Sequence, residues 1–221
     1  MDLSGLSRAA DSVAQSDAPA APLACEAVAT SGGYRHLSTI AGVVIDLRYA
    51  SANNFVGRNL YAPLDCAWLH RDAAQALAAS AAWLAAQGRG ERLLVLDAMR
   101  PQRVQEALWA ALQGTSLLGY LAPPERGSIH SFGMAVDATV IDAAGNELDM
   151  GSGFDELNEK SHPALETKLH AEGALSEAHL EHRQRLRDAM RHGGFQGISH
   201  EWWHFDCGDR EHVRRHYPRI L

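Results

Sequence analysis

An alanine-rich run from Leu69 to Gln87 is the feature that most constrains the fold. Its apolar residues, including Leu77 and Leu84, recur at helical spacing, which predicts a long helix with one buried face. Gly88 ends this pattern, and residues 93–96 then have the composition of a short buried strand. A helix that leads directly into a buried strand indicates that helices pack against a sheet in this chain.

The rest of the chain alternates irregularly between strand and helix patterns. Strands are predicted at residues 42–49, 134–140 and 203–207, and helices at residues 102–113 and 176–191. These segments do not form a regular series of strand, helix and strand. We therefore expect an α+β fold with an antiparallel central sheet and flanking helices.

Length and composition predict one domain with one substantial core, because the 221 residues are 46% hydrophobic. Residues 1–33 are rich in alanine, serine, proline and glycine and poor in aromatic residues, so we expect them to form a poorly ordered leader. The folded domain is expected at residues 34–221.

Charge and cysteine content exclude several classes of function. The net charge of −7 argues against a nucleic-acid partner, because a phosphate backbone requires a basic surface. No apolar segment typical of a signal peptide or a membrane span is present, so we expect a cytoplasmic protein, although the scarcity of cysteine would also suit a periplasmic one. Cys25, Cys66 and Cys207 lie far apart without a CxxC pair, which indicates neither a disulfide framework nor a thiolate metal site.

The stretch SIHSFGMAVDATV, residues 128–140, places a histidine and an aspartate on either side of a glycine. Gly133 permits a tight turn, so His130 before the turn can fold back toward Asp137 on the strand that follows. A carboxylate on a strand with apolar neighbours is unfavourable unless it is paired, and a metal ion is one such partner.

The stretch HEWWHFDCGD, residues 200–209, carries a second group of polar residues, with His204 on the predicted strand and Glu201 in the turn before it. Hydrolytic zinc sites take three ligands from His, Asp or Glu and keep a fourth position open, and His130, Asp137 and His204 meet that count. Glu201 would then be the separate carboxylate that moves the proton. From these residues alone, polar strands in ordinary hydrogen bonds are an equally good interpretation, since no HExxH pair is present.

The first stretch matches SxHxxGxAxD, and EWWHF matches ExWH. These patterns resemble the two signatures of the zinc D-alanyl-D-alanine dipeptidases of the VanX type and of their D,D-carboxypeptidase relatives. Three further segments resemble the dipeptidase branch, namely DLRYASANNF at 46–55, DAMRP at 97–101 and LDMGSGFDE at 148–156. The resemblance extends over about residues 40–206, and two independent signatures in the family's order make it specific.

This resemblance implies a function for each matching position. His130, Asp137 and His204 would bind one zinc ion per chain at a site on the sheet, and Glu201 would be the general base and acid. Arg100, in DAMRP, resembles the family arginine that stabilises the charge of the tetrahedral intermediate, a task that suits the fixed donors of a guanidinium. Without this resemblance, the sequence would favour the interpretation of Arg100 as a surface residue near the start of a helix.

Three other residues are candidates for contacts with a substrate. Ser128 either forms a hydrogen bond with the substrate or fixes the turn. Asp97 either orients the arginine of DAMRP or caps the helix that begins after it, and the sequence alone favours capping. Asp155, like Asp149 and Glu156 in the same segment, could pair with the amino group of a free dipeptide.

We therefore expect a zinc metallopeptidase that hydrolyses a small dipeptide, D-alanyl-D-alanine. The LDMGSGFDE segment and the lack of a secretion signal favour this activity over that of a D,D-carboxypeptidase acting on longer peptidoglycan peptides. A zinc-binding recognition module without turnover is a weaker alternative, because Glu201 and Arg100 are both present. A thiol enzyme that uses Cys207 is weaker still, because Cys207 follows the strand alternation and fits a buried thiol.

Overall fold

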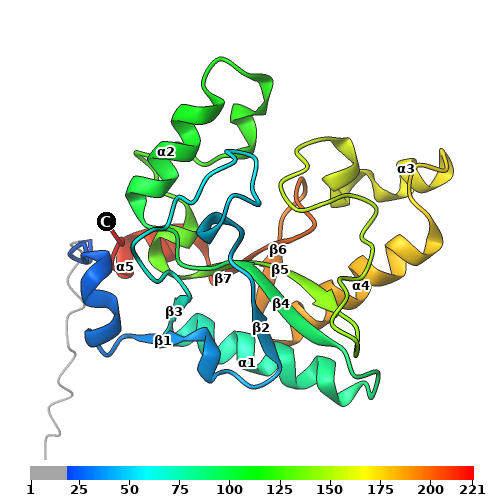
Figure 1. The fold of residues 1–221 in the computed structure, drawn as a ribbon, viewed down its shortest axis with the longest axis horizontal. Helices are drawn as coiled ribbons and strands as arrows, with labels where there is room; N and C mark the ends of the chain where they lie inside the picture. Colours follow the sequence, from blue (N-terminus) through cyan, green and yellow to red (C-terminus); the bar gives the residue numbers. More distant parts are fainter. Residues whose placement is uncertain (1–18) are drawn as a thin grey trace, which may run out of the picture.

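A mixed five-stranded sheet forms the centre of the computed structural model, which describes residues 19–221 (Figure 1). The order across the sheet is β2 (Val43–Ile45), β4 (Arg92–Asp97), β5 (Ala135–Ile141), β7 (His204–Cys207) and β6 (Phe195–Gly197). The last four strands pair antiparallel, as predicted, whereas β2 pairs parallel with β4. A purely antiparallel sheet is therefore wrong at this edge, because the connection from β2 to β4 includes a helix that returns the chain in the same direction.

Two long helices lie together on one side of this sheet (Figure 1). α1 (Arg71–Ala86) contacts β4 and β7, and α4 (Glu177–His192) contacts β5, β6 and α1. The alanine-rich face of α1 allows a close approach, since the chain at Gly193, directly after α4, lies against Ala76 and Ser80. Any side chain at position 193 would collide with both residues, so the small residues of α1 set how closely the two helices pack.

The predicted helices are present, with small changes at their ends. The helix predicted over residues 69–87 starts later, because Trp68–His70 forms strand β3. β3 pairs antiparallel with β1 (Tyr34–His36) in a separate two-stranded sheet. The helix predicted over residues 102–113 is α2 (Gln102–Leu112).

Other elements differ more from the sequence patterns. β2 is shorter than the strand predicted over residues 42–49, because Arg48–Ala50 forms a 3₁₀ helix. Two short helices, α3 (Glu166–Ala171) and α5 (Arg210–His216), have too few residues to produce a clear periodicity. Among the helices of residues 19–221, none has the length and apolar character needed to cross a membrane.

The part of the expected leader that the structure describes, residues 19–33, is packed against the domain. Cys25 and Val28 are buried in a 3₁₀ helix, and the backbone of Leu23 pairs with the C-terminal end of the chain. The prediction of poor order is thus wrong for these residues, because two buried apolar side chains and backbone hydrogen bonds hold them in place. Residues 1–18 of the predicted leader lie outside the described residues.

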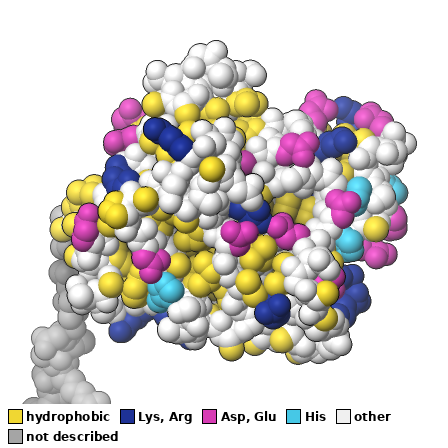
Figure 2. Space-filling model, in the orientation of Figure 1, with side chains coloured by type: hydrophobic (Ala, Val, Ile, Leu, Met, Phe, Trp, Pro, Cys, Tyr) yellow, Lys and Arg dark blue, Asp and Glu magenta, His cyan; other side chains and the backbone are white. Residues whose placement is uncertain are grey.

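The middle strand, β5, is buried along its whole length. Its polar residues Asp137 and Thr139 therefore lie out of contact with bulk water. A polar residue on β5 consequently needs a partner within the protein or in a bound ligand. In the view of Figure 2, apolar side chains gather at the surface between the parts of the molecule formed by α2 and α3.

Candidate metal centre

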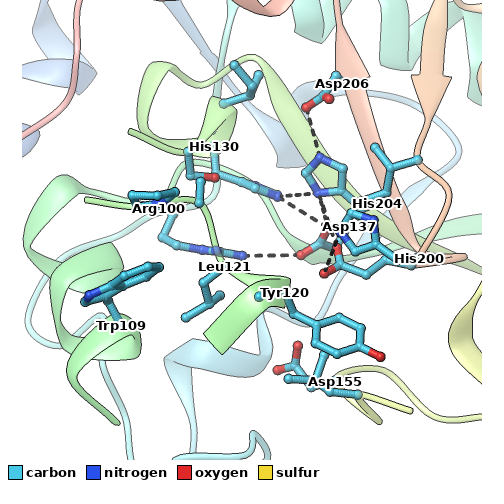
Figure 3. A pocket seen from close by; sticks show the side chains of 18 of the residues that line it. Arg100, Trp109, Tyr120, Leu121, His130, Asp137, Asp155, His200, His204 and Asp206 are labelled. Atoms are coloured by element: carbon cyan, nitrogen blue, oxygen red, sulfur yellow. Dashed lines mark hydrogen bonds and ion pairs between the residues drawn. The ribbon is translucent and has the colours of Figure 1, made fainter. Parts of the chain in front are cut away.

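Three buried side chains meet at the end of β5 (Figure 3). His130 lies in a short 3₁₀ helix, and Gly133 then turns the chain into β5 with a φ of 65°, which favours glycine. Asp137 of β5 lies directly opposite His204 of β7 in the antiparallel register. The turn and the register together bring the two predicted clusters into one site.

The facing atoms of these residues are His130 Nε2, Asp137 Oδ1 and His204 Nδ1. His204 Nδ1 lies 3.0 Å from Asp137 Oδ1 and 3.1 Å from His130 Nε2, and His130 Nε2 lies 3.3 Å from Asp137 Oδ1. Such a set of two imidazole nitrogens and one carboxylate oxygen is typical of a hydrolytic zinc site.

The far nitrogens of both imidazole rings face groups that can only accept a hydrogen bond. His130 Nδ1 donates to the backbone oxygen of Ala98 at 2.7 Å, and His204 Nε2 donates to Asp206 Oδ1 at 2.9 Å. Asp206 is itself held by Arg210 Nε at 2.6 Å. When both rings are neutral, their lone pairs therefore face Asp137, and three electron-rich atoms at this separation fit around a cation.

The charges in this group stabilise one another. Burial disfavours the charged form of Asp137, but His130 and His204 hold the pKa of that carboxyl well below its usual range. Burial alone would lower the pKa of His204, whereas Asp206 and Asp137 raise it well above its usual value. The site therefore favours positive charge at its centre, as a metal ion would supply.

Glu201 lies in the loop before β7, beside the three facing atoms but outside their set. Its side chain is only 12% exposed, and its Oε2 lies 4.0 Å from His204 Nδ1. Burial is the main cause that raises the pKa of Glu201 to about 7. A carboxyl that titrates near neutrality can both accept and return a proton, which is the property predicted for this residue.

Arg100 follows β4 and reaches the same site from the other side. Its Nε donates to Asp97 Oδ2 at 2.8 Å, and one terminal nitrogen lies 3.4 Å from Asp137 Oδ2. The guanidinium also lies over the ring of Tyr49, 5.2 Å from its centroid. The expectation of a surface arginine, made without the family, is therefore wrong, since Arg100 is only 6% exposed.

Asp97 is fully buried behind Arg100 and does not line the cavity that Arg100 and Glu201 face. One carboxylate oxygen binds Arg100, and the other accepts bonds from the Ala98 amide and the Tyr61 hydroxyl. Pro101 is the residue at the N-cap of α2, and no side chain caps it. The favoured prediction of a helix cap is therefore wrong, because the arginine and the hydroxyl occupy the carboxylate, and Asp97 instead orients Arg100.

A cavity of about 480 Å³ opens onto the three facing atoms. Glu201, Ser128 and Asp155 line it together with His130, Asp137 and His204. Ser128 begins the 3₁₀ helix of His130 without capping it through its side chain. The wall away from the strands is more apolar and includes residues that the sequence did not indicate, among them Trp109, Tyr120 and Leu121 (Figure 3).

Asp155 is the only one of the three candidate acids in LDMGSGFDE that lines the cavity. Its Oδ2 accepts a hydrogen bond from the Tyr49 hydroxyl at 2.8 Å, and burial raises its pKa well above the usual range. Asp149 and Glu156 instead face outward, where Asp149 pairs with His179. Figure 3 shows Asp155 and Asp206 on opposite sides of the three facing residues.

Comparisons with known proteins place the chain in a family of peptidases. A family model described as peptidase M15, D-ala-D-ala dipeptidase, matches residues 32–220. A D-alanyl-D-alanine dipeptidase of Escherichia coli strain K12 is 43% identical over 162 residues, which are 73% of this chain and 77% of that protein. Proteins of the same name from Enterococcus faecium and Enterococcus faecalis are 31% and 32% identical, over 84% and 76% of this chain and 96% and 87% of their own lengths.

Proposed function

Because the chain belongs to the D-alanyl-D-alanine dipeptidase family of M15 metallopeptidases, we propose that it hydrolyses D-alanyl-D-alanine to free D-alanine. One observation carries the proposal beyond family membership. His130, Asp137 and His204 direct three metal-binding atoms to one point, with Glu201 and Arg100 beside them in the same cavity.

The proposed cofactor is one zinc ion per chain, held by His130 Nε2, Asp137 Oδ1 and His204 Nδ1. When bound, zinc supplies a Lewis acid that polarises the scissile carbonyl and acidifies a water molecule. The hydrogen bonds to Ala98 and Asp206 fix the orientation of the two rings, so that little rearrangement is needed when the ion enters.

Glu201 is the proposed general base and acid. Its carboxylate accepts a proton from the attacking water and then gives it to the nitrogen of the leaving D-alanine. Burial raises the pKa of Glu201 to about 7 in the protein without metal, which strengthens this carboxylate as a base for the attacking water.

Arg100 is proposed to stabilise the negative charge that develops on the carbonyl oxygen. Its contacts with Asp97 and Gln105 hold the guanidinium in one orientation, and its terminal nitrogen already lies beside Asp137. A donor that is fixed before the reaction need not reorganise in the transition state, and it acts strongly because the site is shielded from water.

Asp155 is proposed to bind the free amino group of the substrate. The carboxylate lines the cavity, and its hydrogen bond from Tyr49 leaves its other oxygen for a second donor. An ammonium group would also offset the cost of keeping this carboxylate ionised in a buried place. Ser128, on another part of the wall, is a candidate to bind the substrate by a hydrogen bond.

A panel of three substrates tests the proposal. The zinc-loaded protein should release D-alanine from D-alanyl-D-alanine, but much less from its N-acetylated form and from a longer peptide that ends in the same two residues. Release from the longer peptide at an equal or greater rate would instead favour a D,D-carboxypeptidase. Tight binding of zinc without release from any of the three would favour a recognition module.

A further inference from the structure

Arg183 of α4 is a buried arginine outside the proposed reaction site, with a side chain only 1% exposed. Its Nε donates to the backbone oxygen of Met150 at 2.7 Å, and a terminal nitrogen donates to the backbone oxygen of Lys160 at 2.7 Å. The same terminal nitrogen lies 3.4 Å from Ser152 Oγ. One guanidinium therefore holds both ends of residues 150–160, here termed the Asp155 segment.

The Asp155 segment has little regular structure of its own, since it lies between β5 and α3 with only two residues of a short 3₁₀ helix at its end (Figure 1). Within residues 19–221, Asp155 is the one residue other than glycine with a positive φ, at 58°. This conformation is unfavourable for an aspartate, and it persists where surrounding contacts enforce it. The hydrogen bonds from Arg183 to both ends of the segment are contacts of this kind.

The same arginine also reaches the loop that carries Glu201. Its guanidinium carbon lies 6.0 Å from the centroid of the Trp202 ring, and Trp202 Nε1 donates to Ser152 Oγ at 3.0 Å. Trp202 directly follows Glu201 in the chain. Arg183 therefore contacts two segments that approach the cavity from different parts of the sequence.

We infer that Arg183 is a positioning residue, which fixes the carboxylate of Asp155 relative to Glu201 and so sets how the amino end of the substrate is held. The inference rests on the proposed function for its effect on catalysis, but not for its effect on the segment. An ion pair with Glu166 does not explain the burial of Arg183, because Arg187 makes a shorter contact with the same carboxylate oxygen, 2.8 Å against 3.3 Å.

The test compares Arg183→Lys with Arg187→Lys, a matched control one helical turn away that shares Glu166 but forms no hydrogen bond with the Asp155 segment. A lysine keeps the charge, but its ammonium group cannot reproduce the hydrogen bonds that the planar guanidinium donates to Met150 and Lys160. In hydrogen exchange of the zinc-loaded proteins, the Asp155 segment should exchange faster in Arg183→Lys only, while β5 stays unchanged in both variants. Faster exchange in β5 as well would reveal general unfolding, and Ser152→Ala would then replace the lysine variant.

Kinetics separate positioning from a purely structural effect. Arg183→Lys should raise KM for D-alanyl-D-alanine about tenfold or more with a smaller change in kcat and unchanged zinc content, because a displaced binding group weakens substrate binding. In an Asp155→Asn background the same change should add little, since both act through one contact. Equal effects with and without Asp155, or unchanged exchange of the segment, would overturn the inference. If the wild type shows no turnover, the proposed function fails, and exchange still decides whether Arg183 fixes the segment.

Discussion

Replacement of Glu201 by glutamine should stabilise the metal-free protein at alkaline pH. The carboxyl has a pKa of about 7 in the folded protein, against an ordinary value of 4.5. This difference corresponds to about 3 kcal/mol, since each pKa unit is worth ~1.36 kcal/mol. Glu201 forms no side-chain hydrogen bond with another described residue, so glutamine loses little and removes a buried charge.

The effect has a defined dependence on pH. Below pH 4.5 the carboxyl is protonated in both the folded and the unfolded chain, so its ionisation does not affect the free energy of unfolding. Between pH 4.5 and about 7 the unfolded chain releases the proton more readily, and the wild type loses stability as the pH rises. Above that range the loss is complete, and Glu201→Gln should be the more stable protein by about 3 kcal/mol.

Urea denaturation of both metal-free proteins at pH 5 and pH 8 measures this difference. Glu172→Gln, at an exposed position, serves as the control and should not change the dependence on pH. Zinc should reduce the advantage of Glu201→Gln, because a nearby cation stabilises the ionised carboxylate. Equal stability of Glu201→Gln and wild type at pH 8, or the same difference at both pH values, would refute the reasoning.

Three further substitutions or treatments test other parts of the site. Arg100→Lys should still bind zinc but have a kcat about 100-fold lower, because a lysine cannot contact Asp97 and also face the carbonyl oxygen. A normal kcat in a variant with full zinc content would contradict this. Asp206→Asn should weaken zinc binding about 10- to 100-fold in competition with a chromophoric chelator, because His204 loses the charged partner that orients its ring. Unchanged zinc affinity would argue against this role of Asp206. Removal of zinc by a chelator should abolish turnover and lower the thermal midpoint, and zinc should restore both; turnover without metal would exclude the proposed chemistry.

The meeting of the three candidate metal ligands could be predicted because each comes from a short local pattern. His130 and Asp137 are joined by one turn at Gly133, and His204 begins the strand that pairs with β5. The resemblance to the family then distinguished metal binding from ordinary hydrogen bonding, a choice that the residues alone left open. The pairing of Asp137 opposite His204 is the structural reason that two separate motifs form one site.

Contacts between distant segments could not be predicted in the same way. Tyr49 and Asp155 are 106 residues apart, and no spacing rule relates them. Asp97 shows the same difficulty, because a local rule favours a helix cap, whereas Arg100 and the distant Tyr61 hydroxyl occupy its carboxylate. The parallel pairing of β2 is likewise set by the path of the chain rather than by the composition of the strand.

The most direct test of the account is D-alanine release from D-alanyl-D-alanine by the zinc-loaded wild type and by Glu201→Ala with its zinc content verified. The account predicts turnover by the wild type and a loss of at least about 100-fold in a variant that still binds one zinc ion through His130, Asp137 and His204. Wild-type protein that binds zinc but releases no D-alanine would contradict the account, as would a zinc-loaded variant that retains full turnover.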